Sequence, residues 1–194
     1  MSKFLDMDGL GYLVGNYIKP GLTDYIDNTT YKNLLNFNDW ANNIQVYNGT
    51  KQITGNSIKL TATGNDCYTK YLTSDFPPNV IIPVTSGQTY IMTWDCNDTS
   101  ELGLGRVYMF GNGSPSYPAA ASSIHKYIRY TIPSAVTYLT FRIGVDKAEE
   151  GKNTITYSNL MICTEENYKI SSAYVPYRNN VASNSEIYNM WESN

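Results

Sequence analysis

The sequence predicts an all-β protein, an antiparallel β-sandwich preceded by a short helical arm. From about residue 33 onward, apolar and polar side chains alternate with the period of two that is typical of strands. Turn-forming pairs such as Asn48-Gly49 and Ser86-Gly87 interrupt these runs at short intervals. No long amphipathic helix lies between the runs, which excludes a parallel sheet of βαβ units.

The first thirty residues follow a helical period instead. Apolar side chains recur there at the spacing that places them on one stripe of an α-helix, and Pro20-Gly21 ends the pattern. Helices this short do not hold in isolation, so the stripe must be covered. It could pack on the sandwich of its own chain, or dock on sister subunits or a larger particle, and we favour docking. The predicted anchor residues are Leu10, Leu13, Val14, Tyr17 and Ile18.

The strand-like runs occupy the middle of the chain. They are residues 44–47, 57–63, 68–72, 80–84, 89–96, 106–110, 127–132, 138–145 and 154–163. We therefore divide the chain into an arm (1–30), a sandwich (31–178) and a C-terminal tail (179–194). The tail contains a short helical pattern whose apolar edge includes Trp191, which is expected either to dock on an assembly partner or to fold back onto the sandwich.

Alternation within the runs sorts their side chains onto two faces. The predicted core set is Tyr90, Met92, Trp94, Cys96, Val107, Met109, Ile128, Tyr130, Ile132, Leu139, Phe141, Ile143 and Val145. The opposite set gathers tyrosine, arginine and aspartate from several strands. Aromatic rings cover the C–H faces of a sugar while arginine and aspartate bind its hydroxyl groups, so this set suits a glycan. It equally suits a protein interface, and periodicity leaves both open.

A family resemblance rests on segments taken in order along the chain. They are Asn33-Leu34-Leu35 followed by Trp40, then 82–94 (IPVTSGQTYIMTW), 130–134 leading into 138–145, 155–162 (ITYSNLMI) and 174–177 (YVPY). Together they resemble a carbohydrate-binding-module jelly roll, a galactose-binding-like sandwich, as found in bacteriophage and prophage virion proteins. The opening FLDMDGLGYL (4–13) is similar to the N-terminal segment of small phage structural proteins. The resemblance implies a jelly-roll virion protein.

One departure from that family changes the expected site. In sugar-binding members an aromatic residue on the strand that holds Trp94 often faces the cleft, whereas the alternation here places Trp94 in the core. The candidate stacking residues are therefore Tyr108, Tyr127 and Tyr138, and the candidate polar partners are Arg129, Arg142 and Asp95.

Catalysis finds little support in the sequence, and we predict that the protein is not an enzyme. His125 is the one histidine, with no nucleophile evident beside it. Glu149-Glu150 and Glu165-Glu166 are adjacent pairs in turn-like segments, where side chains diverge, so we interpret them as solvated loop charges. No cofactor is predicted; Asp66, Asp95 and Asp98 could contribute to a structural calcium site, but the spacing of a calcium loop is absent.

Charge and apolar content limit the partners. The net charge is -3 without a basic run, which argues against nucleic acid. No apolar run reaches the roughly 20 residues that span a bilayer, and the N-terminus lacks the pattern of a signal peptide, so we expect synthesis in a cytosol and no membrane partner. The three cysteines, Cys67, Cys96 and Cys163, fit neither a disulfide framework nor a zinc site and are interpreted as inert buried thiols.

These observations lead to three functional hypotheses. The first is a phage virion surface protein, made in the cytoplasm of the host bacterium, anchored by its N-terminal helices and displaying a glycan-binding sandwich for host adhesion. The second is a head fibre or capsid decoration protein without sugar affinity. The third is a carbohydrate-binding module of a bacterial glycan-degrading system. The first two imply other virion proteins as partners and a homo-oligomer, with a trimer favoured by analogy with fibres.

Overall fold

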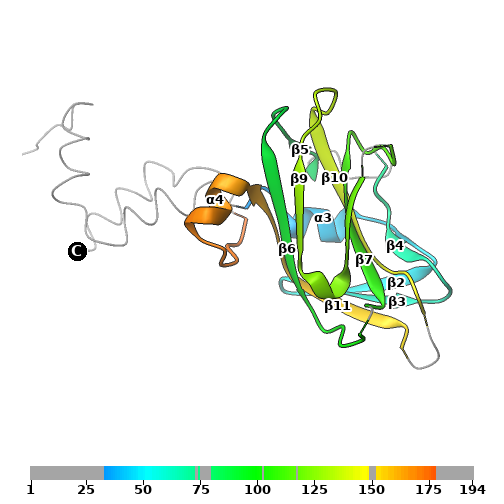
Figure 1. Ribbon diagram of the computed structural model, residues 1–194. Coiled ribbons are helices and arrows are strands. Elements are labelled where there is room, and N and C mark those ends of the chain that lie inside the picture. Colours follow the sequence, from blue (N-terminus) through cyan, green and yellow to red (C-terminus); the bar gives the residue numbers. More distant parts are fainter. Residues whose placement is uncertain are drawn as a thin grey trace, which may run out of the picture. The chain divides into compact units, whose positions relative to one another are not determined.

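Two antiparallel sheets form the body of the protein, as the alternation predicted. The computed structural model describes residues 33–72, 74, 80–101, 103–116, 118–148 and 152–177, and Figure 1 shows the body they build. The β10 sheet has the strand order β1-β4-β10-β7-β8, with β5 also paired to β10, and the β11 sheet has the order β2-β3-β11-β6-β9. The antiparallel β-sandwich is therefore confirmed, and its two layers match a jelly roll.

The strands are as follows. The β10 sheet contains β1 (Val46–Tyr47), β4 (Cys67–Thr69), β5 (Ile82–Pro83), β7 (Gly105–Gly111), β8 (Pro118–Ser122) and β10 (Tyr138–Val145). The β11 sheet contains β2 (Gly49–Thr54), β3 (Ser57–Ala62), β6 (Thr89–Cys96), β9 (Tyr127–Thr131) and β11 (Thr154–Thr164). The sequence did not predict β2 or β8, and it gave β1, β4 and β5 longer bounds than they have.

The core lies between the inner faces of the two sheets. Leu139, Phe141, Ile143 and Val145 of β10 are fully buried there, as expected from their alternation. The other predicted core residues are also buried, except Cys96, which is half-buried. Phe110 lies on the opposite face of β7, away from this core, and is nevertheless buried, with 3% of its surface exposed. The ring of Tyr71 covers it.

A short helix that the sequence did not predict, α3 (Phe37–Asn43), packs into this core. Asn36 caps it by accepting a hydrogen bond from the Asp39 N–H. Trp40 is fully buried, and its ring centroid lies 4.6 Å from that of Phe141. The ammonium group of Lys51 satisfies the last carbonyls, donating to Ala41 and Ile44 at 2.6 Å each.

A second helix, α4 (Glu165–Ile170), follows β11 directly and lies on the outer side of β6 and β9 (Figure 1). The Thr164 hydroxyl caps it by accepting from the Asn167 N–H. A small apolar cluster of Ile91, Met161 and Cys163 on the outer face of the β11 sheet is buried beneath Tyr168 of the helix and Tyr174. Glu165-Glu166 thus begins a helix, which corrects the interpretation of this pair as solvated loop charges.

The amide of Asn33 joins the two ends of the described body. Its nitrogen donates to the Leu160 and Val175 carbonyls at 3.3 and 2.9 Å. Its oxygen accepts from the Leu35 and Ile162 N–H groups at 3.0 and 3.2 Å. These bonds lie at a bulge in β11, where the pairing with β6 shifts register between Ser158 and Met161. Asn33 therefore satisfies backbone groups that the ladder leaves open.

The predicted arm and tail lie outside the described residues. This holds for the anchor residues Leu10, Leu13, Val14, Tyr17 and Ile18 and for Trp191, whose roles stay predictions. Residues Lys32–Tyr177 form one compact unit. Within the described part of the chain, no helix is long and apolar enough to cross a membrane.

Candidate functional site

The outer face of the β10 sheet carries a group of aromatic side chains with an arginine among them. The members come from β1, β4, the segment after β4, β7 and β10, and we call them the aromatic–arginine face. They are Tyr47, Tyr68, Tyr71, Tyr108, Phe110 and Arg142.

Strand register brings these residues together from distant parts of the sequence. Tyr47 pairs with Tyr68 across β1 and β4, and Arg142 pairs with Tyr108 across β10 and β7. Gly144 of β10 is the partner of Tyr68. A methyl group at Gly144 would lie 2.6 Å from the Cys67 carbonyl oxygen and 3.0 Å from the Tyr68 Cβ. The glycine is therefore needed for the close approach of β4 that places Tyr68 beside Arg142.

Arg142 lies between two tyrosine rings. Its guanidinium carbon is 4.5 Å from the centroid of the Tyr68 ring and 4.3 Å from that of Tyr108, and Tyr71 follows at 5.5 Å. Such cation–π contacts are each worth about 0.5–1 kcal/mol at exposed sites. They hold the guanidinium in one place, and within the described residues its N–H groups have no hydrogen-bond acceptor and no ion-pair partner.

The rings of this face also contact one another. Tyr71 stacks on Phe110 with centroids 4.0 Å apart and planes inclined by 17°, and Tyr108 and Phe110 are 5.5 Å apart at 11°. The Tyr47 and Tyr68 centroids are 5.2 Å apart. Tyr47 is 47% exposed at one end of the group. Rings fixed in this way present an apolar surface without further loss of side-chain freedom on binding.

Charged groups flank the face at the Gly144 end of β10. Arg106 and Asp146 form an ion pair with Nε and Oδ2 3.3 Å apart. Burial raises the pKa of Asp146, and the charges of Arg142 and Arg106 oppose that shift. Burial likewise raises the pKa of Tyr68, whereas the charge of Arg142 lowers it. The face is thus partly desolvated, and Asp146 is engaged by Arg106.

Tyr138, the third predicted residue on β10 or β7, lies on the same outer side at the other end of β10. Its hydroxyl donates to the Asn112 carbonyl at 2.9 Å. The Asn112 side-chain oxygen in turn accepts from the Thr137 N–H, and its nitrogen donates to the Ala135 carbonyl. Tyr138 thus supports the turn after β7.

The other predicted residues, Tyr127, Arg129 and Asp95, lie on the outer face of the β11 sheet. Arg129 donates to both carboxylate oxygens of Glu165, at 2.7 and 3.3 Å. The ring of Tyr127 lies 5.8 Å from that of Tyr168. Asp95 accepts from the Asn159 amide at 2.9 Å. The six predicted residues therefore belong to two faces of the molecule, and the arginine and tyrosine of β9 attach helix α4.

Sequence reasoning missed Tyr47, Tyr68 and Tyr71. Tyr68 and Tyr71 lay in a run predicted as a strand, and Tyr47 ended another, but these runs were not sorted into faces. The only signal available was the density of tyrosine in them. The pairing of β1 with β4 and of β4 with β10 places these residues on one face, and the second of these pairings joins segments more than seventy residues apart.

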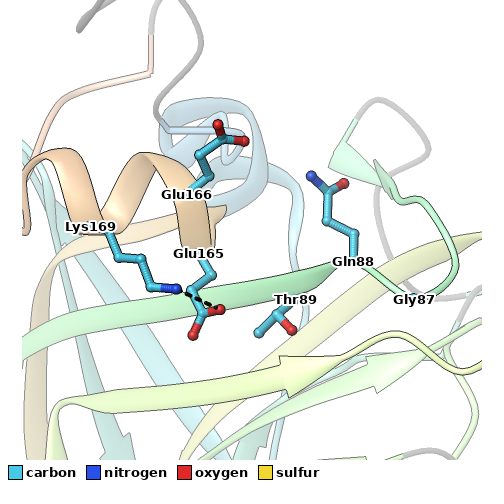
Figure 2. Close-up of a pocket in the computed structure, with 6 residues that line it drawn as sticks. All are labelled: Gly87, Gln88, Thr89, Glu165, Glu166 and Lys169. Carbon is cyan, nitrogen blue, oxygen red and sulfur yellow. Dashed lines mark ion pairs between the residues drawn. The ribbon is translucent and has the colours of Figure 1, made fainter.

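A pocket of about 360 Å³ lies beside α4 and is lined by Gly87, Gln88, Thr89, Glu165, Glu166 and Lys169. Figure 2 shows the ion pair of Lys169 with Glu165, with Nζ and Oε2 3.3 Å apart. The hydrogen bond from Arg129, followed by that from Lys169, lowers the pKa of Glu165. A carboxylate held ionised by two cations is poorly suited to act as a general acid.

A second pocket of about 300 Å³ includes Asn97, Asp98, Ser100, Leu104 and Lys152 in its lining. The Asp98 carboxylate accepts from the Ser100 and Leu104 N–H groups and from the hydroxyls of Ser100 and Ser123. Burial would raise the pKa of Asp98, but these hydrogen bonds together lower it. Its oxygens are thus occupied by donors. Among the described residues, no group of three or more His, Cys, Asp and Glu side chains is placed to hold a metal.

His125 ends the 3-10 turn Ser123–His125, and its Nδ1 lies 2.9 Å from the Ser122 hydroxyl. Asp98 binds the neighbouring Ser123 and not the imidazole. A catalytic triad needs a carboxylate hydrogen-bonded to a histidine that is in turn hydrogen-bonded to a nucleophile, and these residues do not form such a chain of hydrogen bonds.

Comparison with known proteins finds solved structures that resemble this chain in fold. No protein-family model matches the sequence and no curated protein matches it. A solved structure described as "CBM4 structure and function" is 11% identical with a TM-score of 0.42, covering 66% of this chain and 81% of that chain. A family 29 carbohydrate-binding module complexed with cellulohexaose is 11% identical with a TM-score of 0.37, covering 70% and 90%. The CBM22-1 and GH10 modules of a Clostridium thermocellum xylanase complexed with xylohexaose are 10% identical with a TM-score of 0.36, covering 79% of this chain and 30% of that chain.

Proposed function

We propose that the sandwich binds a glycan on the aromatic–arginine face. The observation that carries this proposal is the position of Arg142 between the rings of Tyr68 and Tyr108, 4.5 and 4.3 Å away. Fixed rings cover the C–H faces of sugars, and a fixed guanidinium donates to their oxygens. Both elements of sugar recognition therefore meet on one rigid sheet, where little ordering is needed on binding.

We infer a binding role rather than a catalytic one. In each of the two pockets a carboxylate is engaged, Glu165 by Arg129 and Lys169 and Asp98 by Ser100, Leu104 and Ser123. The aromatic–arginine face itself contributes rings and a cation, without a carboxylate pair that could flank a glycosidic bond. Incubation of the full chain with any glycan it binds, followed by chromatography of the sugar, should return the glycan unchanged.

A glycan array with the full chain and two variants tests the binding proposal. Tyr108→Ala should lower binding to each hit by roughly tenfold, since one aromatic contact is worth about 0.5–1.5 kcal/mol beyond its buried area. Tyr127→Ala is the matched control, because Tyr127 is a tyrosine 38% exposed on the other sheet. Equal loss in both variants, or no hit with the wild-type chain, would contradict the proposal.

The setting in which the face is displayed is a further proposal, supported by the resemblance of residues 4–13 to phage structural proteins. In it, the arm (1–30) anchors the chain to a virion or to sister chains, and the sandwich faces outward as an adhesin. Deletion of residues 1–30 should then convert an oligomer or particle-bound subunit into a monomer, measured by light scattering. Stable attachment without glycan binding would favour a decoration protein, and a monomeric full chain that binds glycan would favour a carbohydrate-binding module of a glycan-degrading system.

A further inference from the structure

We infer that the glycan bound on the aromatic–arginine face is acidic, and that Arg142 binds a carboxylate group of one of its sugars. This inference rests on the proposed function and names the chemical class of its ligand. It depends on how Arg142 is held and on what its guanidinium lacks.

The N–H groups of Arg142 are available to a ligand. The guanidinium carbon lies over the rings of Tyr68 and Tyr108, 4.5 and 4.3 Å from their centroids, and its N–H groups donate to none of the described residues. The N–H groups of a guanidinium lie in its plane and form a fork that matches the two oxygens of a carboxylate. An arginine already fixed by stacking loses little further freedom when this fork is used.

The other two arginines of the described residues show what Arg142 is missing. Arg106 has its carboxylate at 3.3 Å in Asp146, and Arg129 donates to both oxygens of Glu165. Arg142 is half-buried among rings, and the ion pairs found among the described residues do not include it. Asp146 is near enough to feel its charge but is bound by Arg106. Arg106 and Arg129 each have a carboxylate of the chain as ion-pair partner, and an incoming anion would supply the corresponding partner to Arg142.

Charge decides between a neutral and an acidic ligand. A neutral sugar can accept hydrogen bonds from the guanidinium, but hydrogen bonds between two ionised partners are about twice as strong. The surrounding rings reduce hydration of the guanidinium and so raise the effect of an opposite charge. The rings still require a sugar, because a free anion would leave the apolar surface of Tyr47, Tyr71 and Tyr108 uncovered. A uronic acid or a sialic acid supplies both parts in one residue.

The test compares acidic and neutral glycans on the full chain. An array that carries uronate-containing, sialylated and neutral oligosaccharides identifies the hits. Each acidic hit is then treated to reduce its carboxylates to primary alcohols, which keeps the rings and linkages unchanged. We expect the reduced glycan to bind roughly tenfold more weakly, and the affinity for the acidic form alone to fall as salt is raised.

Variants of Arg142 connect the effect to this residue. Arg142→Gln should remove the preference for the acidic form, and Arg142→Lys, which keeps the charge without the fork, should recover only part of it. Arg129→Gln is the matched control and should bind as the wild type does. If Arg142→Gln does not fold, as judged by thermal unfolding, carboxyl reduction on the wild-type chain still gives a decision.

The outcomes separate this inference from the proposed function. Binding of neutral glycans alone, or equal binding of the reduced and acidic forms, overturns the acidic ligand and leaves glycan binding intact. A preference for the acidic form that persists in Arg142→Gln overturns the role of Arg142. Absence of any binding, acidic or neutral, overturns both proposals.

Discussion

The hydroxyl of Tyr157, on β11, donates a 2.7 Å hydrogen bond to the carbonyl of Gly144, on β10, and so connects the two sheets through the core. Tyr157 is fully buried, and burial raises the pKa of its phenol well above the usual value. Gly105 of β7 lies against this bond, because a Cβ there would overlap both the Gly144 carbonyl oxygen and the Tyr157 hydroxyl. The contact between the sheets thus depends on a residue without a side chain.

Gly105→Ala should therefore lower the free energy of unfolding by about 2 kcal/mol or more, as overpacking of a core does when backbone must move. Gly64→Ala is the matched control, since a Cβ at Gly64 meets no atom within 4 Å. Denaturant unfolding followed by tryptophan fluorescence measures both. If the Gly105→Ala protein were as stable as the control, the two sheets would have to accommodate the added methyl group at little cost, and the prediction would be wrong.

Asn33→Ala should lower the free energy of unfolding by about 2–4 kcal/mol, because buried groups then lose their hydrogen-bond partners. The amide serves two carbonyls and two N–H groups at the bulge of β11. Asn42→Ala removes only an exposed bond to the Asn38 carbonyl and should change stability far less. The same denaturant measurement compares the two, and equal effects would refute the structural role of Asn33.

Acid should destabilise the protein partly through Asp98. Hydrogen bonds from Ser123, Ser100 and Leu104 outweigh burial and place the folded-state pKa of Asp98 below its ordinary value of 3.8. A lowered folded-state pKa contributes stability that is present above pH 3.8 and is lost as the pH falls through the folded-state pKa. Asp98→Asn should be less stable than the wild type at neutral pH and lose less of its stability in acid. Urea midpoints measured across this range test the prediction, and parallel curves would contradict it.

The thiols should be protected while the protein is folded. Burial raises the pKa of Cys67 to about 11, and Cys163 is also fully buried. Cys96 is half-buried and donates to the Ser123 carbonyl at 3.3 Å, and burial is the main cause of its raised pKa. A thiol reagent at about pH 8 should label Cys67 and Cys163 only after unfolding, with Cys96 slow in the native state. Fast native labelling of Cys67 would be inconsistent with this fold.

Strands with regular alternation were predictable, and those without it were not. In β10, every second residue from Leu139 to Val145 is apolar, which identified both the strand and its core face. By contrast, β2 (GTKQIT) and β8 (PAAAS) lack large apolar residues in alternation. Helix α3 is seven residues long, too short for a helical period to stand out, and it is held by the burial of Trp40. Its stability comes from the tertiary fold rather than from local preference.

The candidate site was predictable in part for the same reason. Alternation placed Tyr108 and Arg142 on the outward side of their strands, and the structure brings these two together. Alternation could not show that Arg129 lies on a different side of the molecule. The alternation of side chains assigns each residue to one face of its strand, but it does not tell which of the two sheets the strand belongs to. Only the pairing of β9 with β6, and of β7 with β10, makes that distinction.

The Asn33 bonds have a consequence for the use of this domain as a building block. Since Asn33 binds Val175 directly, residues 33 and 177 emerge from the same corner of the sandwich. A short linker could join them, and new termini could be opened in the turn that contains Gly64, giving a circular permutant with the same sheets. The same geometry would let the sandwich be inserted into a surface loop of another protein, because both of its connections to that protein would leave from one point on its surface.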